Sequence, residues 1–392
     1  MLVLHTADWH LGKKLGRFER YEEMGRFIDW MVDECRQRAV DLVLIAGDLF
    51  DTPSPPNRAV GLATDALRRL TGQGAKVVVI SGNHDSPDFF ENLNQFSELH
   101  GVHLVGRLQQ PNDGGILRIQ TRAGPAAVAC CPYVREHNVV DFFSERRHRH
   151  HDYKEHLGQI LAAFDDELAN YADCVRLLVG HLAVDGAALR RARESRRPRG
   201  ERILTIGNTY VLEGRQLPAN AQYTALGHLH SSQRVPSPAG QTRYSGSPLA
   251  LEFGESGDRK QIVLVEAVPD RRARVKTIDV GSIGRQLLEA SGSWEELVAR
   301  REEFGDDYLS LTVTGADAPR ALLQRAAETF PMLVRAHLVS ADAEALAQAR
   351  NLDRDWSEIY AEYVNATVGK EPPEGLMAEF KRIYAVAASA SD

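Results

Sequence analysis

Long apolar runs are missing from this sequence, in which no stretch approaches the roughly 18 apolar residues that a membrane-spanning helix needs. The first residues are apolar and lead into Asp8 without a basic segment, which argues against a signal peptide. Both absences predict a cytoplasmic protein.

Cysteine is scarce as well. The four cysteines show no C-x-x-C spacing and lie in apolar segments, at Cys35, Cys130, Cys131 and Cys174. We expect them to be reduced and buried, which excludes a disulfide framework and a zinc knuckle. The net charge of -7 excludes a globally basic nucleic-acid-binding protein, but it permits a local positive patch or a bound pair of cations.

The order of the expected elements indicates the fold class. Buried strands at residues 2–7, 41–46 and 76–80 alternate with helices at residues 21–38 and 57–70, the second capped by Asn57. A long helix is expected at residues 153–171. Further strands are expected before and after it in the sequence, at residues 102–105, 116–120, 126–131, 175–179, 223–226, 243–245 and 261–266. This order predicts an α/β protein, α+β by some schemes, with helices outside a sandwich of mixed sheets. A length of 392 residues allows two or three domains.

Five short segments each place a candidate metal ligand directly after an apolar run. They are Asp8-Trp9-His10, Gly47-Asp48, Gly82-Asn83-His84-Asp85, Gly180-His181 and Gly227-His228-Leu229-His230. In four of them a glycine precedes the ligand, which permits a tight turn and lets the side chains converge at the ends of strands. Together, the five segments predict one site for two divalent cations.

The residue types in these segments suit a phosphoester as substrate. Asp48 is the natural bridging ligand because a carboxylate has two oxygens. Asp8 and His10 are two positions apart and face one side of an extended chain, as do the two histidines of the last segment. Asn83 is neutral, so two aspartates oppose two dications and the filled site stays cationic. Two cations about 3.5–4 Å apart can share a water, lower its pKa and stabilise the attacking and leaving oxygens.

The residues beside these ligands allow more than one role. We expect His84 to orient the phosphate and to protonate the leaving 3′ or 5′ oxygen. Asp85 either orients that imidazole or makes a helix-cap or loop hydrogen bond. Asp51 either lies behind a ligand or caps a helix or turn. His5 is expected in the core. A solvated surface, rather than a third metal site, is expected for His148, His150 and His151.

These motifs resemble the ordered signature of the calcineurin-like metallophosphoesterases. Within that superfamily, residues 5–12 and 244–251 are similar to the double-strand-break repair nuclease family, and the resemblance is strong to about residue 270. Thr52 supports this choice, because the protein phosphatases of the superfamily commonly carry arginine there. Archaeal members of the nuclease family often have histidine where Asp51 stands, so no second catalytic histidine is transferred.

The resemblance implies a four-layer αββα metallophosphoesterase sandwich and a definite ligand set. One manganese ion would be held by Asp8, His10, Asp48 and His230, and the other by Asp48, Asn83, His181 and His228. His84 would be catalytic. The mixed oxygen and imidazole ligands also suit Fe²⁺ or Zn²⁺, and Mg²⁺ is a further candidate.

Two arginine-rich segments bear on the substrate. Seven arginines fall between residues 189 and 202, and residues 146–149 form a second basic cluster. Both are either phosphate contacts or solvated loops. Neither segment contains interleaved aromatic residues, which disfavours a base-stacking platform.

The pattern changes after residue 270. Strands at residues 274–280, 308–313 and 333–340 and helices at residues 293–304 and 319–330 predict a small α+β unit without ligands, which the resemblance implies to be a capping domain at residues 271–345. Two amphipathic helices follow within residues 346–392, with apolar stripes at Trp356, Ile359, Tyr360, Tyr363 and Val364 and at Leu376, Phe380, Ile383 and Tyr384. They either bind the SMC-like ATPase that the resemblance implies as partner or pack on this chain.

The residue pattern predicts two-metal hydrolysis of a phosphoester, and the resemblance implies a manganese-dependent DNA nuclease that acts on duplex ends, single strands and hairpins. The resemblance implies double-strand exonuclease and single-strand endonuclease action in DNA repair, recombination and replication, and a homodimer within a heterotetramer that includes the ATPase. A cyclic-nucleotide or small phosphodiester hydrolase is the first alternative. The second is a non-catalytic scaffold, which the complete ligand set disfavours.

Overall fold

A computed structural model describes residues 1–134, 153–184, 211–238, 241–315, 319–339, 360–361, 364–365, 372–373 and 375–380. The chain divides into two compact units. The first comprises Met1–Glu289, Glu303–Ser310 and Met332–Arg335, and the second comprises Ala290–Glu302, Leu311–Pro331 and Ala336–Asp392. Within the described residues, no helix is both long and apolar enough to cross a membrane.

The first unit contains two six-stranded sheets. The first sheet has the order β14-β13-β1-β4-β5-β6, with the bounds β14 Arg274–Asp279, β13 Gln261–Glu266, β1 Leu2–Thr6, β4 Leu42–Ala46, β5 Lys76–Ile80 and β6 Val102–Val105. Strands β1, β4, β5 and β6 are parallel, whereas β13 is antiparallel to β1 and to β14. Every residue of β4 is buried, as expected for a central strand that is covered on both faces.

The second sheet is also mostly parallel. Its order is β11-β12-β10-β9-β8-β7, with the bounds β11 Gln233–Val235, β12 Thr242–Tyr244, β10 Tyr223–Gly227, β9 Val175–His181, β8 Gly124–Cys131 and β7 Ile116–Thr121. The four inner strands are parallel, and β7 and β11 are antiparallel edges. Parallel strands end on the same side, so β9 and β10 deliver the residues that follow them to one place.

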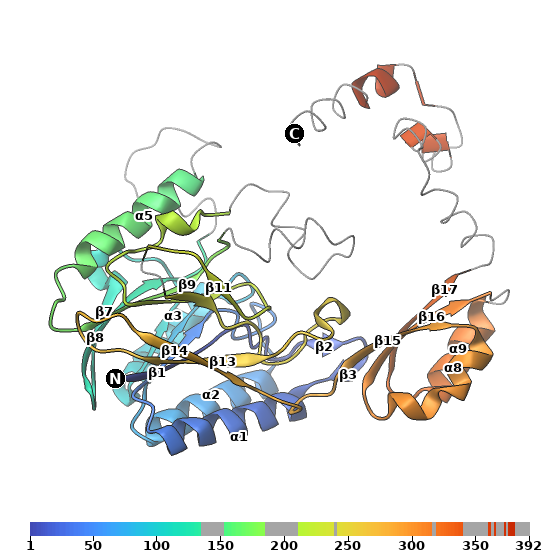
Figure 1. Cartoon of the computed structure of the whole chain (residues 1–392), viewed down its shortest axis with the longest axis horizontal. Coiled ribbons are helices and arrows are strands. Elements are labelled where there is room, and N and C mark those ends of the chain that lie inside the picture. Colours follow the sequence, from blue (N-terminus) through green and yellow to red (C-terminus); the bar gives the residue numbers. More distant parts are fainter. Residues whose placement is uncertain are drawn as a thin grey trace. The chain divides into compact units, whose positions relative to one another are not determined.

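Helices cover the outer faces of both sheets (Figure 1). Their bounds are α1 Tyr21–Arg38, α2 Asn57–Gly72, α3 Pro87–Ser97 and α5 Tyr153–Leu168. One core cluster joins α1 and α2 to the first sheet, a second lies between the sheets, and a third joins the second sheet to α5. In β8, Ala126, Val128 and Cys130 face the first sheet while Ala127, Ala129 and Cys131 face α5, which is the period of two expected of a strand. The predicted four-layer αββα sandwich is confirmed.

Local expectations were met unevenly. The apolar stripe predicted for α1 is buried, and its acidic first turn and basic last turn match the helix dipole. The N-cap of α2 is Pro56, so the prediction of Asn57 as cap is wrong. Helix α3 was not predicted; it begins after Ser86, whose side chain accepts a hydrogen bond from the Phe89 N–H. All four cysteines are buried and unpaired, as expected.

Residues 287–339 contain a three-stranded sheet with the order β15-β16-β17. Its strands are β15 Leu287–Gly292, β16 Tyr308–Thr314 and β17 Leu333–Val339, and the helices of this region are α8 Trp294–Ala299 and α9 Pro319–Thr329. A Ser293–Glu296 capping box starts α8. The sequence pattern groups β14 with this small unit, but β14 pairs with β13 of the first sheet. A short hairpin, β2 Lys14–Leu15 and β3 Phe18–Glu19, completes the strands.

The two C-terminal amphipathic helices remain predictions, because most of residues 346–392 lie outside the described residues. Within the described part, the rings of Tyr360 and Phe380 stack with centroids 4.2 Å apart. These two residues belong to different predicted stripes.

Candidate metal centre

The candidate ligands follow the carboxyl ends of five strands. Asp8 and His10 follow β1, Asp48 follows β4, Asn83 and His84 follow β5, His181 ends β9, and His228 and His230 follow β10. The first three strands lie in one sheet and the last two in the other, so both sheets contribute. A Cβ atom added to Gly227 would lie 1.8 Å from the carbonyl oxygen of Ala46, so the ends of β10 and β4 touch and glycine is required there.

Backbone strain is concentrated at this place. Six non-glycine residues among those described have positive φ, and four of them are candidate ligands: Asp8, His10, Asp48 and His228. A non-glycine residue in this region costs of the order of 1–3 kcal/mol and persists only where the surrounding structure holds it. The fold therefore holds these side chains in place at the expense of local stability.

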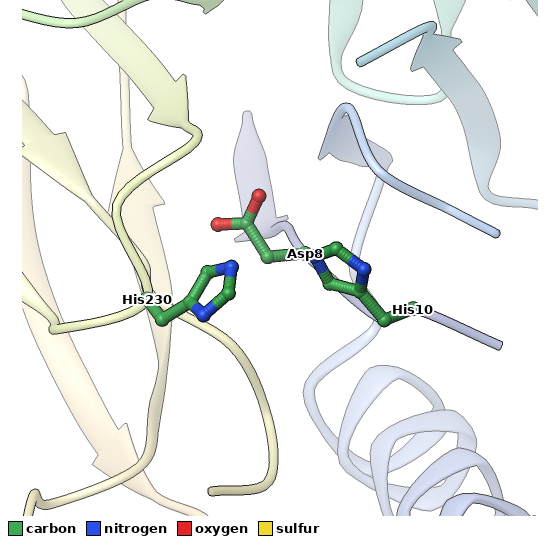
Figure 2. A group of neighbouring side chains, drawn as sticks. All are labelled: Asp8, His10 and His230. Carbon is green, nitrogen blue, oxygen red and sulfur yellow. The ribbon is translucent and has the colours of Figure 1, made fainter. Parts of the chain in front are cut away.

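One cluster brings together Asp8, His10 and His230, with one ligand atom of each within 4.8 Å of the others. Figure 2 shows the carboxylate and the two imidazoles around a common space, reached from the β1 side and from the segment after β10. Asp48 borders the same cluster, because its Oδ2 lies 3.5 Å from Nε2 of His10.

A second cluster contains the remaining predicted ligands. Oδ2 of Asp48 lies 3.4 Å from Nε2 of His181. Oδ1 of Asn83 lies 3.0 Å from Nε2 of His181 and 3.0 Å from Nδ1 of His228. The structure thus gathers all seven predicted ligands, with Asp48 between the two clusters.

The donor atoms fit a pair of divalent cations. In the described part of the chain, Oδ2 of Asp8, Nε2 of His10, Oδ2 of Asp48 and Nε2 of His230 are buried without a hydrogen-bond partner. Leaving such an atom unsatisfied costs about 1–3 kcal/mol, so four of them in one place fit the donor set of a metal site. Oxygen and imidazole donors suit manganese, iron or zinc.

At this centre the negative carboxylates of Asp8 and Asp48 interact with the neighbouring imidazoles. Burial raises the pKa of Asp8, and His181 and His230 offset part of this effect. Burial alone would raise the pKa of Asp48 as well, but His181 and His10 hold it well below its usual range. Burial lowers the pKa of His181, yet Asp48 and Asp8 raise it to about 9. The imidazoles thus supply positive charge that bound cations would supply instead.

The ring orientation of two ligand histidines is set from behind. Nδ1 of His10 donates to Oδ1 of Asp51 at 3.1 Å, and Nζ of Lys13 donates to the same oxygen at 3.1 Å. Nδ1 of His181 donates to the carbonyl oxygen of Ala46 at 2.9 Å. In both rings Nε2 is left to face the centre. Of the two roles considered for Asp51, the structure supports the one behind a ligand.

His84 and Asp85 have separate roles. Nδ1 of His84 donates to the carbonyl oxygen of Asp51 at 2.9 Å, and one ring nitrogen lies within 4.8 Å of ligand atoms of His10 and Asp48. Asp85 accepts the backbone N–H groups of Leu49, Phe50 and Gly82 at 2.9–3.1 Å. Asp85 therefore makes the predicted loop hydrogen bonds. Burial and the charge of Asp48 raise the pKa of Asp85 to about 7.

Sequence reasoning missed three residues at this site. The ring of Tyr133 stacks on that of His228 with centroids 6.3 Å apart. The buried hydroxyl of Tyr244 donates to the carbonyl of Leu182 at 2.7 Å and accepts from the Val184 N–H at 2.9 Å, which holds the chain after His181. The third is Glu255, whose Oε1 lies 2.7 Å from Nδ1 of His230. Only Tyr244 carried a signal, as the start of the segment 244–251.

Other predictions concern residues beyond this site. The core position expected for His5 is confirmed: the side chain is buried, and its Nδ1 lies 2.8 Å from the Tyr223 hydroxyl. Two arginine-rich segments, residues 146–149 and 189–202, lie outside the described residues. The same is true of His148, His150 and His151.

The fold, the position of the site and its donor set are those of a phosphoester-hydrolysing metalloenzyme, and comparison with known proteins agrees. Residues 1–232 match the family model described as calcineurin-like phosphoesterase. One similar curated protein is the SbcD subunit of the nuclease SbcCD of Bacillus subtilis (strain 168), 31% identical over 92% of this chain and 89% of the relative. Another, the corresponding SbcCD subunit of Escherichia coli (strain K12), is 29% identical over 78% of this chain and 74% of the relative.

The chain therefore belongs to the calcineurin-like phosphoesterase family and, within it, to the family of the SbcD subunits of SbcCD nucleases. The resemblance stated from the motifs is confirmed. A solved dimetal phosphatase from Danio rerio is 13% identical, with 71% of this chain and 96% of that chain covered and a TM-score of 0.39.

Proposed function

We propose that this chain is a manganese-dependent DNA nuclease that hydrolyses phosphodiester bonds at a dinuclear centre. The position of Asp48 between two clusters of candidate ligands, built from both sheets, carries the proposal. The relatives named as SbcCD nuclease subunits support DNA as the substrate. Following this resemblance, we assign exonuclease action to duplex ends and endonuclease action to single strands and hairpins.

The proposed ligands divide between the two ions. One cation would be held by Asp8, His10, Asp48 and His230, and the other by Asp48, Asn83, His181 and His228. When bound, the cations would lower the pKa of water and offset the charge of the phosphodiester. The protein contributes two carboxylates to the ligand set, so the loaded site stays positive and attracts an anionic backbone.

The residue proposed to act on the substrate is His84. Its backbone N–H donates to Oδ1 of Asp48 at 2.9 Å, and its Nδ1 donates to the Asp51 carbonyl, so both the main chain and the ring of His84 are held in place. We assign Nε2 to the leaving oxygen, to which it would deliver a proton. His84 is half-buried, whereas the ligand His181 is fully buried. A partly exposed ring suits a group that must meet a substrate.

A nuclease assay tests this proposal. Linear duplex DNA is incubated with the protein and Mn²⁺, with and without an SbcC-type ATPase and ATP. We expect degradation, and we expect the His84→Ala protein to be slower by roughly 10²–10⁴-fold, the usual contribution of a general acid. The matched control is His100→Ala, an exposed histidine at the end of a 3-10 turn, which should leave the rate unchanged.

Other outcomes would favour the alternatives. Hydrolysis of bis-p-nitrophenyl phosphate or cyclic nucleotides without action on DNA under any condition would favour a small-phosphodiester hydrolase. Inertness toward all of these with two manganese ions bound would favour a scaffold.

The proposal extends to the remaining regions of the chain. We assign residues 1–270 to the nuclease domain, together with β14, which pairs with β13 of the first sheet. We assign the rest of residues 271–345 to a capping domain and residues 346–392 to helices that bind an SbcC-type ATPase, within a heterotetramer that contains two copies of this chain. The exposed Leu376 offers a test. Leu376→Glu should weaken co-purification with the ATPase without changing manganese binding.

A further inference from the structure

His230, a proposed ligand of the first cation, is supported by a buried carboxylate. Oε1 of Glu255 lies 2.7 Å from Nδ1 of His230. A carboxylate accepts, so the imidazole carries a hydrogen on Nδ1, and Nε2 is the nitrogen left for a cation. That Nε2 is buried without a hydrogen-bond partner, and His230 offers a ring nitrogen within 4.8 Å of ligand atoms of Asp8 and His10. Glu255 therefore selects the tautomer that presents Nε2 to the cation.

A lysine fixes this carboxylate in turn. Nζ of Lys260 donates to Oε2 of Glu255 at 2.6 Å, to the hydroxyl of Ser247 at 2.9 Å and to the carbonyl oxygen of His230 at 3.1 Å. Three acceptors match the three hydrogens of an ammonium group. The Leu251 N–H donates to the same Oε2 at 3.0 Å. The side chains of Glu255 and Lys260 are only 5% and 9% exposed, so water does not compete for these contacts.

The segment 244–251 completes the support. The Ser247 N–H donates to the carbonyl oxygen of His230 at 3.1 Å. Gly246 has φ +76°, and a Cβ atom added to it would lie 2.6 Å from that same carbonyl oxygen. This segment contributes to the resemblance but contains none of the proposed ligands. Its role here is to hold the main chain of His230 while Glu255 holds the ring.

The same arrangement recurs at the other imidazole of the first cluster. His10 donates to Asp51, which also accepts from Lys13. The pair behind His10 is more exposed, at 22% for Asp51 and 27% for Lys13. His181, in the second cluster, rests on a backbone carbonyl instead. Both imidazoles of the first cation site are therefore backed by a carboxylate–lysine pair, and the pair behind His230 is the more deeply buried of the two.

We propose that Glu255, held by Lys260, is a positioning residue that orients His230 and strengthens binding of the first cation. This inference rests on the proposed dinuclear centre. Outer hydrogen bonds of this kind typically contribute about 10–100-fold to metal affinity, because they fix the tautomer and raise the basicity of the ligand ring.

Manganese titration of the full chain tests the inference, by calorimetry and by the electron paramagnetic resonance signal of free Mn²⁺. Glu255→Gln keeps the size of the side chain but leaves one acceptor oxygen, which cannot serve both His230 and Lys260. We expect one of two sites to weaken by about 10–100-fold while the other keeps its affinity. The matched control is Glu289→Gln, which removes an exposed carboxylate paired with Arg335 and should change neither site.

Thermal unfolding without metal separates positioning from a purely structural role. A lower midpoint for Glu255→Gln, with manganese affinity unchanged in the folded protein, would overturn the inference. Lys260→Met gives a second reading, because it releases the Glu255 carboxylate, and it should weaken the same site. Unaltered affinity in both variants would also overturn the inference. If the wild-type chain failed to bind two manganese ions, the dinuclear centre itself would be refuted.

Discussion

Two buried polar clusters in the first unit differ in how completely their groups are paired. Away from the metal centre, Glu23 accepts from Nε and Nη2 of Arg20 at 2.9 and 3.1 Å, from the Tyr308 hydroxyl at 2.9 Å and from the Arg285 N–H at 2.7 Å. Arg20 also donates to the carbonyl of Ala250. This cluster joins α1 to β16, and both oxygens of its carboxylate are used.

The candidate metal centre shows the opposite condition. Four of its donor atoms are buried without partners, and four of its residues have strained backbones. The polar groups of this centre leave donor atoms available to a bound ion, whereas the polar groups around Glu23 hydrogen-bond to one another. A closed cluster stabilises the fold, and an open one reduces stability in exchange for function.

Asp48→Asn should give the largest effect and sharpens this contrast. The change removes the anion shared by both clusters, so we expect loss of both DNA hydrolysis and binding of the second manganese ion. Metal-free stability should fall only modestly, because the attraction of Asp48 to His181 and His10 is lost while its burial cost and its repulsion of Asp8 are relieved. Nuclease assays, manganese titration and thermal unfolding measure these effects. Marked destabilisation of the metal-free protein would place Asp48 in the same class as Glu23.

Glu23→Ala should have the reverse profile. It leaves the buried guanidinium of Arg20 without its carboxylate partner, a change that typically costs about 3–5 kcal/mol of unfolding free energy. Manganese affinity should be unchanged in the folded protein. Urea denaturation measures the loss, and Glu22→Ala, at an exposed position of the same helix turn, is the control. Equal stability of the two variants would contradict the prediction.

Gly227→Ala tests the place where the two sheets meet. The new methyl group would collide with the Ala46 carbonyl, and forced overpacking of this kind costs typically about 1–3 kcal/mol. We expect lower manganese affinity as well, because the shift separates β4 from β10. Gly257→Ala, where no atom lies within 4 Å of the added Cβ, is the comparison at another glycine. That position has positive φ, so a modest loss of stability without loss of affinity is expected there.

The smallest effect is a dependence of stability on pH. Burial alone would raise the pKa of Glu23, but Arg20 and its other partners hold it below the ordinary value of 4.5. The unfolded chain then binds more protons than the folded chain just below pH 4.5, so stability falls on acidification through this window. Urea midpoints from about pH 6 to about pH 3 should show a shallower fall in Glu23→Gln than in wild type. If the urea midpoints of wild type and Glu23→Gln fell in parallel with pH, the lowered pKa of Glu23 would not be the cause of the acid sensitivity.

Much of the site was readable in the sequence because it obeys a local rule. Each candidate ligand lies at the end of a strand or within four residues after it, and strands can be recognised from short apolar runs. Parallel strands end together, so the convergence of the ligands followed from that pattern. The helical stripe of α1 was legible for the same reason, since its period is contained within the segment.

Contacts between distant residues were not readable in this way. Nothing near Glu255 in the sequence signals that its carboxylate meets His230, 25 positions away. Asp51 and Asp85 looked alike as acids beside ligands, yet one accepts from an imidazole and a lysine and the other from three backbone N–H groups. The edge strand β14 could not be assigned to a sheet, because pairing depends on the partner strand.

The candidate ligands and their place at strand ends could be read from local sequence, because residue type and apolar periodicity are enough to point to them. Tertiary structure alone established which carboxylates lie behind those ligands, that Asp48 stands between the two clusters, and that the groups around Glu23 pair with one another. These features depend on which atoms come within hydrogen-bonding distance once two sheets and their helices have packed, and that proximity is not encoded within any one segment.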